Sequence, residues 1–463
     1  MATNTVQPPL EFLPPQFKPW VLSVVQHILP AWLLHQQGIS EVQANNLEHL
    51  AALYEQFQRG NVRLLIAFRH PTFDDPPCLL HLINQVLPKV ALQSNIQLQA
   101  PVHLHFLYDR GIPLWAGSLA GWLFSRLGST PIQRGKLDGV GLRSARQLAI
   151  AGQFPLAIAP EGAVNGQSER LSPLEPGIAR LGFWSVEDLQ KAGRSEEVLI
   201  VPIGIQYRYV QTPGAALARL FDQLEVDSGL TKLNQPHPEV GQQSEEWFYY
   251  RLNRLSHHLL QQMEEFYNRF YRQTLPQTGT ISDRLQALLE VALGVAERHF
   301  GIPPTGNLVD RRHRIEQAAW ARIYRSDLPT LDQLSPVERG LANQLATEAN
   351  LYLWHMHWAE SFFNVSEQYV VEKPSLDRMA EMALLLWDCV TRMKGGNPAN
   401  RPRLGLRQVK FTIGEAISVS ECWTSYCTNR ATAIAALTET LQTSLETMVT
   451  EPTSEPDKVP LAS

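Results

Sequence analysis

Residues 61–87 read NVRLLIAFRHPTFDDPPCLLHLINQVL, an apolar run that stops abruptly at a polar turn. The run at 62–68 is short, rich in β-branched and aromatic side chains and preceded by Gly60, which predicts a buried strand. Pro76 directly follows Asp75, so Asp75 is expected to be the N-cap of a helix that has proline at its first position. A strand, a polar turn and a helix in this order predict an α/β fold, which binds its ligands at such turns.

The polar turn contains His70, and Asp75 follows it after four intervening residues. An imidazole titrates near neutral pH, and a carboxylate beside it can fix its tautomer and stabilise the imidazolium that forms on proton abstraction. The pair is therefore a candidate general base with its orienting acid. The alternative is an ordinary turn histidine and a carboxylate that only caps the helix. With 14 His in the chain, this spacing can also arise by accident.

Composition limits the class of protein. The chain has 463 residues, 44% of them hydrophobic, which is enough for two or three domains with buried cores. Lys and Arg number 40 against 45 Asp and Glu, and the net charge of -5 argues against a general nucleic-acid binder. The cysteines show neither CxxC nor Cys/His metal spacing, which predicts a reduced intracellular compartment without a disulfide framework or a bound metal. They are Cys78, Cys389, Cys422 and Cys427.

Residues 1–59 are expected to form an N-terminal lead followed by amphipathic helices. The chain begins without the charged and apolar regions of a secretory signal. Residues 19–34, PWVLSVVQHILPAWLL, are markedly apolar, but Gln26, His27 and Pro30 interrupt them and the segment is short for a membrane span. Two interpretations stay open: the segment lies in a membrane interface, or it packs as a helix on the protein's own core.

Strand and helix patterns alternate over residues 60–210, which predicts the first part of an α/β core. Strands are expected at residues 101–109, 154–160 and 198–209, and a helix at residues 113–128.

The pattern changes to helices over residues 211–404. Leucines and aromatic residues recur there at steps of three and four, which is typical of amphipathic helices. Ser335 and Glu338 have the spacing of a capping box with proline between them at the first helical position. This segment is predicted to be a large all-helical insertion into the α/β core.

Residues 405–449 return to the first pattern, with a strand from residue 407 followed by a C-terminal helix. The segments 198–209 and 407–419 are both short β-rich runs that cannot satisfy their backbone hydrogen bonds alone, so they are expected to share one sheet. Residues 450–463, rich in Pro, Asp and Glu, are predicted to be a disordered tail.

Three further motifs follow the His70/Asp75 pair in order along the chain. They are GSTPIQR, which ends at Arg134, Pro160-Glu161-Gly162 at the end of a predicted strand, and IVPI, which contains Pro202. These four ordered blocks resemble those of the glycerophosphate and lysophosphatidic acid acyltransferase family. The later IGEAI at residues 413–417 is similar to a downstream strand of the same family. The resemblance covers roughly residues 60–210 and 407–449.

The resemblance implies a glycerolipid-acyltransferase-like fold, in which a central mixed sheet is flanked by helices. It implies that His70, oriented by Asp75, deprotonates a hydroxyl of a lysolipid such as lysophosphatidic acid, and that this hydroxyl attacks the thioester of acyl-carrier protein or acyl-CoA. Arg134 would pair with the acceptor phosphate, while Glu161 and Gly162 would hold an acceptor hydroxyl. No metal or other cofactor is implied, and the expected location is the cytoplasm, peripherally on a membrane surface.

The chain also departs from the family pattern. Ala159 stands where the family usually has Phe, and Ala163 and Val164 replace the Thr and Arg that often follow Pro-Glu-Gly. Arg134 could instead form a surface ion pair, and Glu161 could be a simple turn carboxylate. Two alternatives for the whole protein follow: a non-catalytic lipid- or partner-binding protein on the same fold, or an acyltransferase for a different lipid acceptor.

Overall fold

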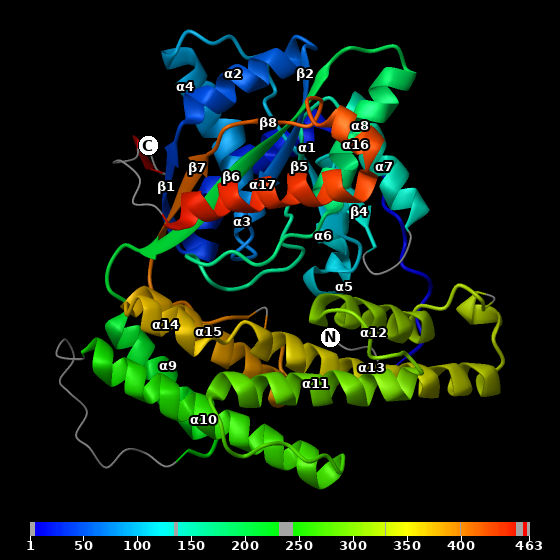
Figure 1. Cartoon of the computed structure of the whole chain (residues 1–463), viewed down its shortest axis with the longest axis vertical. Coiled ribbons are helices and arrows are strands. Elements are labelled where there is room, and N and C mark those ends of the chain that lie inside the picture. Colours follow the sequence, from blue (N-terminus) through cyan, green and yellow to red (C-terminus); the bar gives the residue numbers. More distant parts are fainter. Residues whose placement is uncertain are drawn as a thin grey trace. The chain divides into compact units, whose positions relative to one another are not determined.

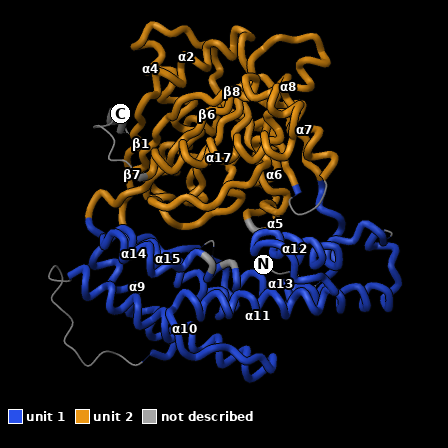
Figure 2. Tube along the Cα trace, in the orientation of Figure 1, with its two compact units in different colours: residues 1–11, 133–137, 212–404 blue, residues 12–132, 138–211, 405–463 orange. Residues whose placement is uncertain are grey.

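The computed structural model describes residues 5–133, 138–230, 244–328, 330–398, 400–450 and 457–460. The chain divides into two compact units, which Figure 2 colours separately. Residues 12–132, 138–211 and 405–463 form one of them, here called the α/β unit, and residues 1–11, 133–137 and 212–404 form the other, called the helical unit.

A sheet flanked by helices lies at the centre of the α/β unit (Figure 1). Its nine described strands have the order β4-β3-β5-β2-β6-β7-β1-β9, with β8 also paired to β6. Neighbours from β4 to β6 are parallel, β7 runs antiparallel to β6, and β1 runs parallel to β7. The strands are β1 (Ile39–Asn45), β2 (Val62–Phe68), β3 (His105–Asp109), β4 (Thr130–Ile132), β5 (Leu156–Ile158), β6 (Glu197–Tyr209), β7 (Arg407–Ile413), β8 (Ile417–Ser418) and β9 (Asp457–Pro460). The predicted class, α/β with a central mixed sheet, is confirmed.

Helices cover both faces of this sheet. Successive side chains of a strand point to opposite faces, and in β2 Leu64 and Ile66 enter one apolar core while Leu65 and Ala67 enter the other. The first core includes residues of α1 (Pro19–Trp32), α2 (Leu47–Gln58), α3 (Asp75–His81) and α4 (Leu87–Gln93), with the π-helical η1 (Leu33–Gln37) and η2 (Leu82–Val86). The second includes residues of α7 (Gly139–Ala151), α8 (Gly177–Lys191), α16 (Trp423–Thr428) and α17 (Arg430–Thr450). Because every residue of β2 is buried, the whole strand reads as one apolar run.

The segment predicted as a helix at residues 113–128 forms two helices, α5 (Ile112–Ala116) and α6 (Ser118–Arg126). Gly117 separates them with a φ of 90°, a backbone conformation that a residue with a side chain rarely adopts.

The predicted pairing of segments 198–209 and 407–419 is confirmed. Strand β6 pairs with β7 in antiparallel register from Ile203 opposite Ile413 to Tyr209 opposite Arg407. The two strands are joined through the sheet, although almost 200 residues separate them in sequence.

Both ends of the chain contribute strands to the sheet that the sequence did not indicate. Residues 12–59 belong to the α/β unit, where they form the helices α1 and α2 and the strand β1. Near the other end, β9 pairs antiparallel with β1. The same physical reason accounts for both, because an open sheet edge offers unpaired backbone groups that another extended segment can satisfy.

The helical unit contains, among its described residues, α9 (Gly214–Asp227), α10 (Glu245–Phe270), α11 (Ile281–Phe300), α12 (Leu308–Ile323), η3 (Leu331–Gln333), α13 (Pro336–Phe363), α14 (Glu367–Glu372) and α15 (Leu376–Met393). The predicted capping box of Ser335 and Glu338 is present at the start of α13. Residues 5–11 join this unit, for example through the Gln7 N–H, which donates to the Ile323 carbonyl.

Ion pairs link successive helices of this unit. Each consists of an arginine of one helix and a buried glutamate of the helix before it: Arg251 with Glu225, Arg284 with Glu264, and Arg311 with Glu297. Removing one partner of such a pair leaves a buried charge uncompensated, which typically costs about 3–5 kcal/mol.

Candidate functional site

The candidate site lies where two neighbouring parallel strands end. Strand β2 ends at Phe68, and the Arg69 N–H still donates to the Ile203 carbonyl of β6 at 3.0 Å, so the backbone is held up to the start of the turn. Strand β5 pairs with β2 on its other side, and the chain after it continues through Pro160 to Glu161. His70 and Glu161 are thereby brought together, although 91 positions separate them in sequence.

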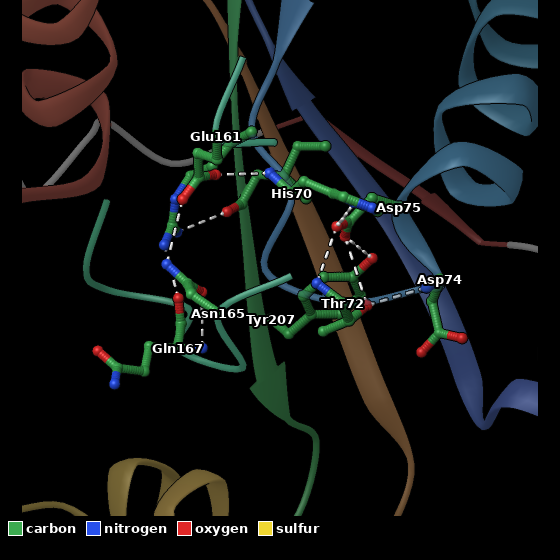
Figure 3. Close-up of polar contacts among 10 residues, drawn as sticks. His70, Thr72, Asp74, Asp75, Glu161, Asn165, Gln167 and Tyr207 are labelled. Atoms are coloured by element: carbon green, nitrogen blue, oxygen red, sulfur yellow. Dashed lines mark hydrogen bonds and ion pairs between the residues drawn. The ribbon is translucent and has the colours of Figure 1, made fainter. Parts of the chain in front are cut away.

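His70 and Asp75 form the predicted pair (Figure 3). The Nδ1 atom of His70 lies 2.9 Å from Oδ2 of Asp75. An ionised carboxylate can only accept, so Nδ1 carries the proton and Nε2 presents its lone pair. Among the described residues, none hydrogen-bonds to Nε2, and 18% of the His70 side chain is exposed, whereas Asp75 is fully buried. This is the tautomer that a general base needs.

The N-cap expectation for Asp75 is wrong by one residue. Helix α3 begins at Asp75 itself, its N-cap is Asp74, and no side chain caps it. The Asp75 carboxylate turns back instead, where the Thr72 N–H donates to Oδ2 at 2.8 Å. Asp74 pairs with the Arg407 guanidinium of β7 at 2.6 Å. The two adjacent acids therefore have separate roles, and only Asp75 reaches the imidazole.

Tyr207 is a site residue that the sequence reasoning missed. It lies near the end of β6, and its hydroxyl donates to Oδ1 of Asp75 at 2.6 Å (Figure 3). Burial raises the pKa of Asp75, while hydrogen bonds from His70 and Tyr207 act in the opposite direction. Burial and the neighbouring carboxylates also raise the pKa of Tyr207 well above its ordinary value, so the phenol keeps its proton and remains a donor.

Glu161 has both carboxylate oxygens engaged inside the protein. Oε1 accepts the backbone N–H of His70 at 2.8 Å, and Oε2 accepts the Ser172 N–H at 2.9 Å and the Asn165 side-chain amide at 3.1 Å. Gly162 follows with a φ of 72°, which allows the turn that brings the loop back. Glu161 thus fixes the backbone at His70, and this arrangement favours a structural role over contact with an acceptor hydroxyl.

Arg69 holds the same loop from the other side. It is fully buried, and its guanidinium donates to backbone carbonyls of the loop and to the Ile205 carbonyl of β6. The loop carbonyls belong to Gln167, Ser168 and Arg170. A planar guanidinium can satisfy several carbonyls at once, which a lysine ammonium cannot do with the same geometry. No sequence signal marked Arg69, since all its partners are distant in sequence.

Two further residues of the predicted motifs are Arg134 and Pro202. Arg134 lies outside the described residues. Pro202 lies within β6, opposite Ala67 of β2. In the described part of the chain, no cluster of three or more His, Cys, Asp or Glu side chains is placed to hold a metal ion.

No described helix combines the length and the apolar character needed to cross a membrane. Comparisons of the chain with protein-family models, with characterised proteins and with solved structures find no match.

Proposed function

We propose that the protein is an O-acyltransferase on a glycerolipid-acyltransferase-like fold. It would transfer a fatty acyl group from acyl-carrier protein or acyl-CoA to a hydroxyl of a lysolipid such as lysophosphatidic acid. The observation that carries the proposal is the 2.9 Å contact between His70 Nδ1 and the buried Asp75 carboxylate, which leaves Nε2 open at the carboxyl ends of parallel strands. The four ordered sequence blocks support it.

In the proposed reaction His70 Nε2 takes the proton of the acceptor hydroxyl as its oxygen attacks the thioester carbonyl. The carbon–sulfur bond then breaks, and the imidazolium returns the proton to the departing thiolate, so that the products are an ester and a free thiol. Asp75 stabilises the imidazolium between these two steps. Neither step needs a metal or another cofactor.

We assign Glu161 as a positioning residue, because all three of its hydrogen bonds hold the His70 backbone and the following loop. Arg134 remains the proposed partner of the acceptor phosphate. Replacing it with alanine is expected to raise the KM for a phosphorylated acceptor and to leave the KM for the acyl donor unchanged.

We further propose that the protein acts peripherally at a membrane surface on the cytoplasmic side. Four apolar side chains of α1 recur at every fourth residue and are exposed, namely Trp20, Val24, Ile28 and Trp32. Trp122 of α6 is also exposed, and its ring lies 6.3 Å from that of Trp20. An exposed apolar stripe with tryptophans at its ends is typical of a helix that lies in a membrane interface.

The proposal is tested by measuring acyl transfer. Purified protein is incubated with labelled acyl-carrier protein or acyl-CoA donors and with phosphorylated or unphosphorylated lysolipids. His70→Ala is expected to lower transfer by on the order of 10² to 10⁴. The control is His49→Ala, which removes a partly exposed histidine of α2 whose Nε2 lies 3.8 Å from a Glu415 carboxylate oxygen. A wild-type protein that binds lysolipid but transfers no acyl group would instead support the binding-only alternative, and equal transfer by His70→Ala would overturn the assigned base.

A further inference from the structure

The Asp75 carboxylate is held at both oxygens by donors from two parts of the fold. Oδ2 accepts from His70 and from the Thr72 N–H in the turn after β2. Oδ1 accepts the Tyr207 hydroxyl from β6 at 2.6 Å and, at the longer distance of 3.4 Å, the Thr72 hydroxyl. Asp75 is fully buried and Tyr207 is 5% exposed. Solvent therefore cannot readily replace the Tyr207 hydrogen bond, and loss of the shorter of its two hydrogen bonds is costly for a buried carboxylate oxygen.

We propose that Tyr207 is a positioning residue that sets the pH at which the His70–Asp75 pair takes up a proton. It touches no reacting atom and keeps its own proton throughout, acting only through Asp75. This role rests on the site of the proposed acyl transfer, but proton uptake by the His70–Asp75 pair can be measured without a substrate.

The charged and titratable groups around Tyr207 are few among the described residues. Helix α3 contributes Asp75 and Cys78, its N-cap is Asp74, and β7 contributes Arg407, whose guanidinium lies 5.1 Å from the centre of the Tyr207 ring. Asp74 and Arg407 form an ion pair with each other, so their charges largely compensate. Burial raises the pKa of the Cys78 thiol well above its usual value, so the thiol stays neutral. The His70–Asp75 pair is thus the titratable pair whose protonation the Tyr207 hydroxyl contacts directly, through Asp75.

The direction of the effect follows from which form of the pair Tyr207 favours. A hydrogen bond to a carboxylate is strongest when no cation neutralises that carboxylate. The Tyr207 hydroxyl therefore stabilises the deprotonated pair, neutral imidazole with free carboxylate, more than it stabilises the ion pair. It also opposes protonation of Asp75 itself. Whichever group takes the proton, loss of the hydroxyl moves proton uptake to higher pH, by about one pH unit for a charge-assisted hydrogen bond.

The experiment compares the full-length wild type with Tyr207→Phe, which removes only the hydroxyl. The titration of His70 is followed by NMR on protein with labelled histidine, and its signal is identified by its loss in His70→Ala. In Tyr207→Phe the midpoint is expected to rise by about one pH unit. The control is Tyr54→Phe, which removes a buried hydroxyl that donates to the His103 carbonyl and should leave the midpoint unchanged. Fluorotyrosine at position 207 is a stronger donor and should lower the midpoint.

An unchanged midpoint in folded Tyr207→Phe, or the same shift in Tyr54→Phe, would overturn the inference. If Tyr207→Phe does not fold, the fluorotyrosine variant decides alone, and a midpoint that does not fall would count against Tyr207. The NMR midpoint does not depend on acyl transfer. If the midpoint shifts but the wild type transfers no acyl group, the shift supports this role of Tyr207, and the missing activity rejects the proposed function. If transfer is observed, the acid limb of kcat/KM should move to higher pH together with the NMR midpoint.

Discussion

Oε1 of Glu161 accepts the backbone N–H of His70 at 2.8 Å, so the turn after β2 is held at His70 by the loop that follows the neighbouring strand β5. The other oxygen of the same carboxylate accepts Ser172 and Asn165. The buried Glu161 side chain thus links the proposed base, His70, to the loop that ends at Ser172, eleven positions after Glu161. The geometry of His70 therefore depends on groups far from it in sequence.

Glu161→Gln tests this coupling. The amide replaces one acceptor oxygen with an NH₂ group that faces donors, so at least one buried N–H loses its partner, at a cost of about 1–3 kcal/mol in the free energy of unfolding. The measurement is urea unfolding, together with kcat and KM. If Glu161 held an acceptor hydroxyl instead, its loss would raise the KM for the acceptor and leave unfolding unchanged. The control is Glu187→Gln, which affects an exposed ion pair of α8 with Lys191.

The free energy of unfolding of the α/β unit is expected to decrease as the pH falls below neutral, because this unit buries neutral histidines. Burial lowers the pKa of His103 from 6.5 to about 3 and that of His105 from 6.5 to about 4. Between these pKa values and pH 6.5 the unfolded chain binds more protons than the folded one. The free energy of unfolding is therefore highest above pH 6.5 and decreases as the pH falls. At pH 5 each histidine should cost about 2 kcal/mol.

The measurement is the urea midpoint from pH 7.5 to pH 5. His103→Gln cannot titrate, so its stability should change less with pH than that of the wild type. His27→Gln, which removes an exposed histidine of α1, should keep the wild-type slope. If the urea midpoint changed equally with pH in all three proteins, His103 would not be a source of the pH dependence.

The exposed stripe of α1 predicts which residues bind a lipid surface. Trp20 and Ile28 are 60% and 58% exposed. Glutamate at either position should weaken binding to vesicles by about tenfold or more, because each buried apolar side chain is worth about 1.5–3 kcal/mol. Leu92→Glu is the matched control, since Leu92 is 79% exposed on α4. Co-sedimentation with vesicles measures the difference, and equal losses in all three variants would argue against a role specific to α1.

The sequence predicted the strands with buried apolar runs. Strand β2 is buried along its whole length and β6 along most of it, while β7 is buried mainly at its carboxyl end. The need to pair their backbones predicted that β6 and β7 share a sheet. Strand β1, ISEVQAN, was missed because it alternates in polar residues, lies near the edge of the sheet and acquires its partners only through β7 and β9. Local composition therefore could not distinguish it from a loop.

In the candidate site, too, only the local features could be predicted from the sequence. His70 and Asp75 could be found from their spacing because they belong to one turn. Tyr207 and Arg69 could not, since their partners lie about 100 or more positions away, and a tyrosine or arginine in an apolar segment has no local signature. The misplaced N-cap has a similar cause: Asp74 and Asp75 are equivalent in sequence, and only the tertiary donors around Asp75 separate them.

The two adjacent acids supply the most direct test of the site. Asp75→Asn keeps the size of the side chain but cannot stabilise an imidazolium, and its NH₂ group faces a donor, either His70 Nδ1 or the Tyr207 hydroxyl. Turnover is expected to fall by on the order of 10⁴, with a loss of about 1–3 kcal/mol in unfolding free energy. Because Asp75 is not the N-cap, helix α3 itself should persist.

Asp74→Asn is the matched control one residue away. Its ion pair with Arg407 is mostly buried, with 15% and 21% of the two side chains exposed, so its loss should cost more than the roughly 1 kcal/mol of an exposed pair while leaving turnover near the wild-type level. Circular dichroism and urea unfolding establish that both variants fold, and acyl transfer is then compared. Equal activity of the two variants would show that the contact between Asp75 and His70 does not contribute to the chemistry, whereas loss confined to Asp75→Asn would identify the 2.9 Å contact as the one on which transfer depends.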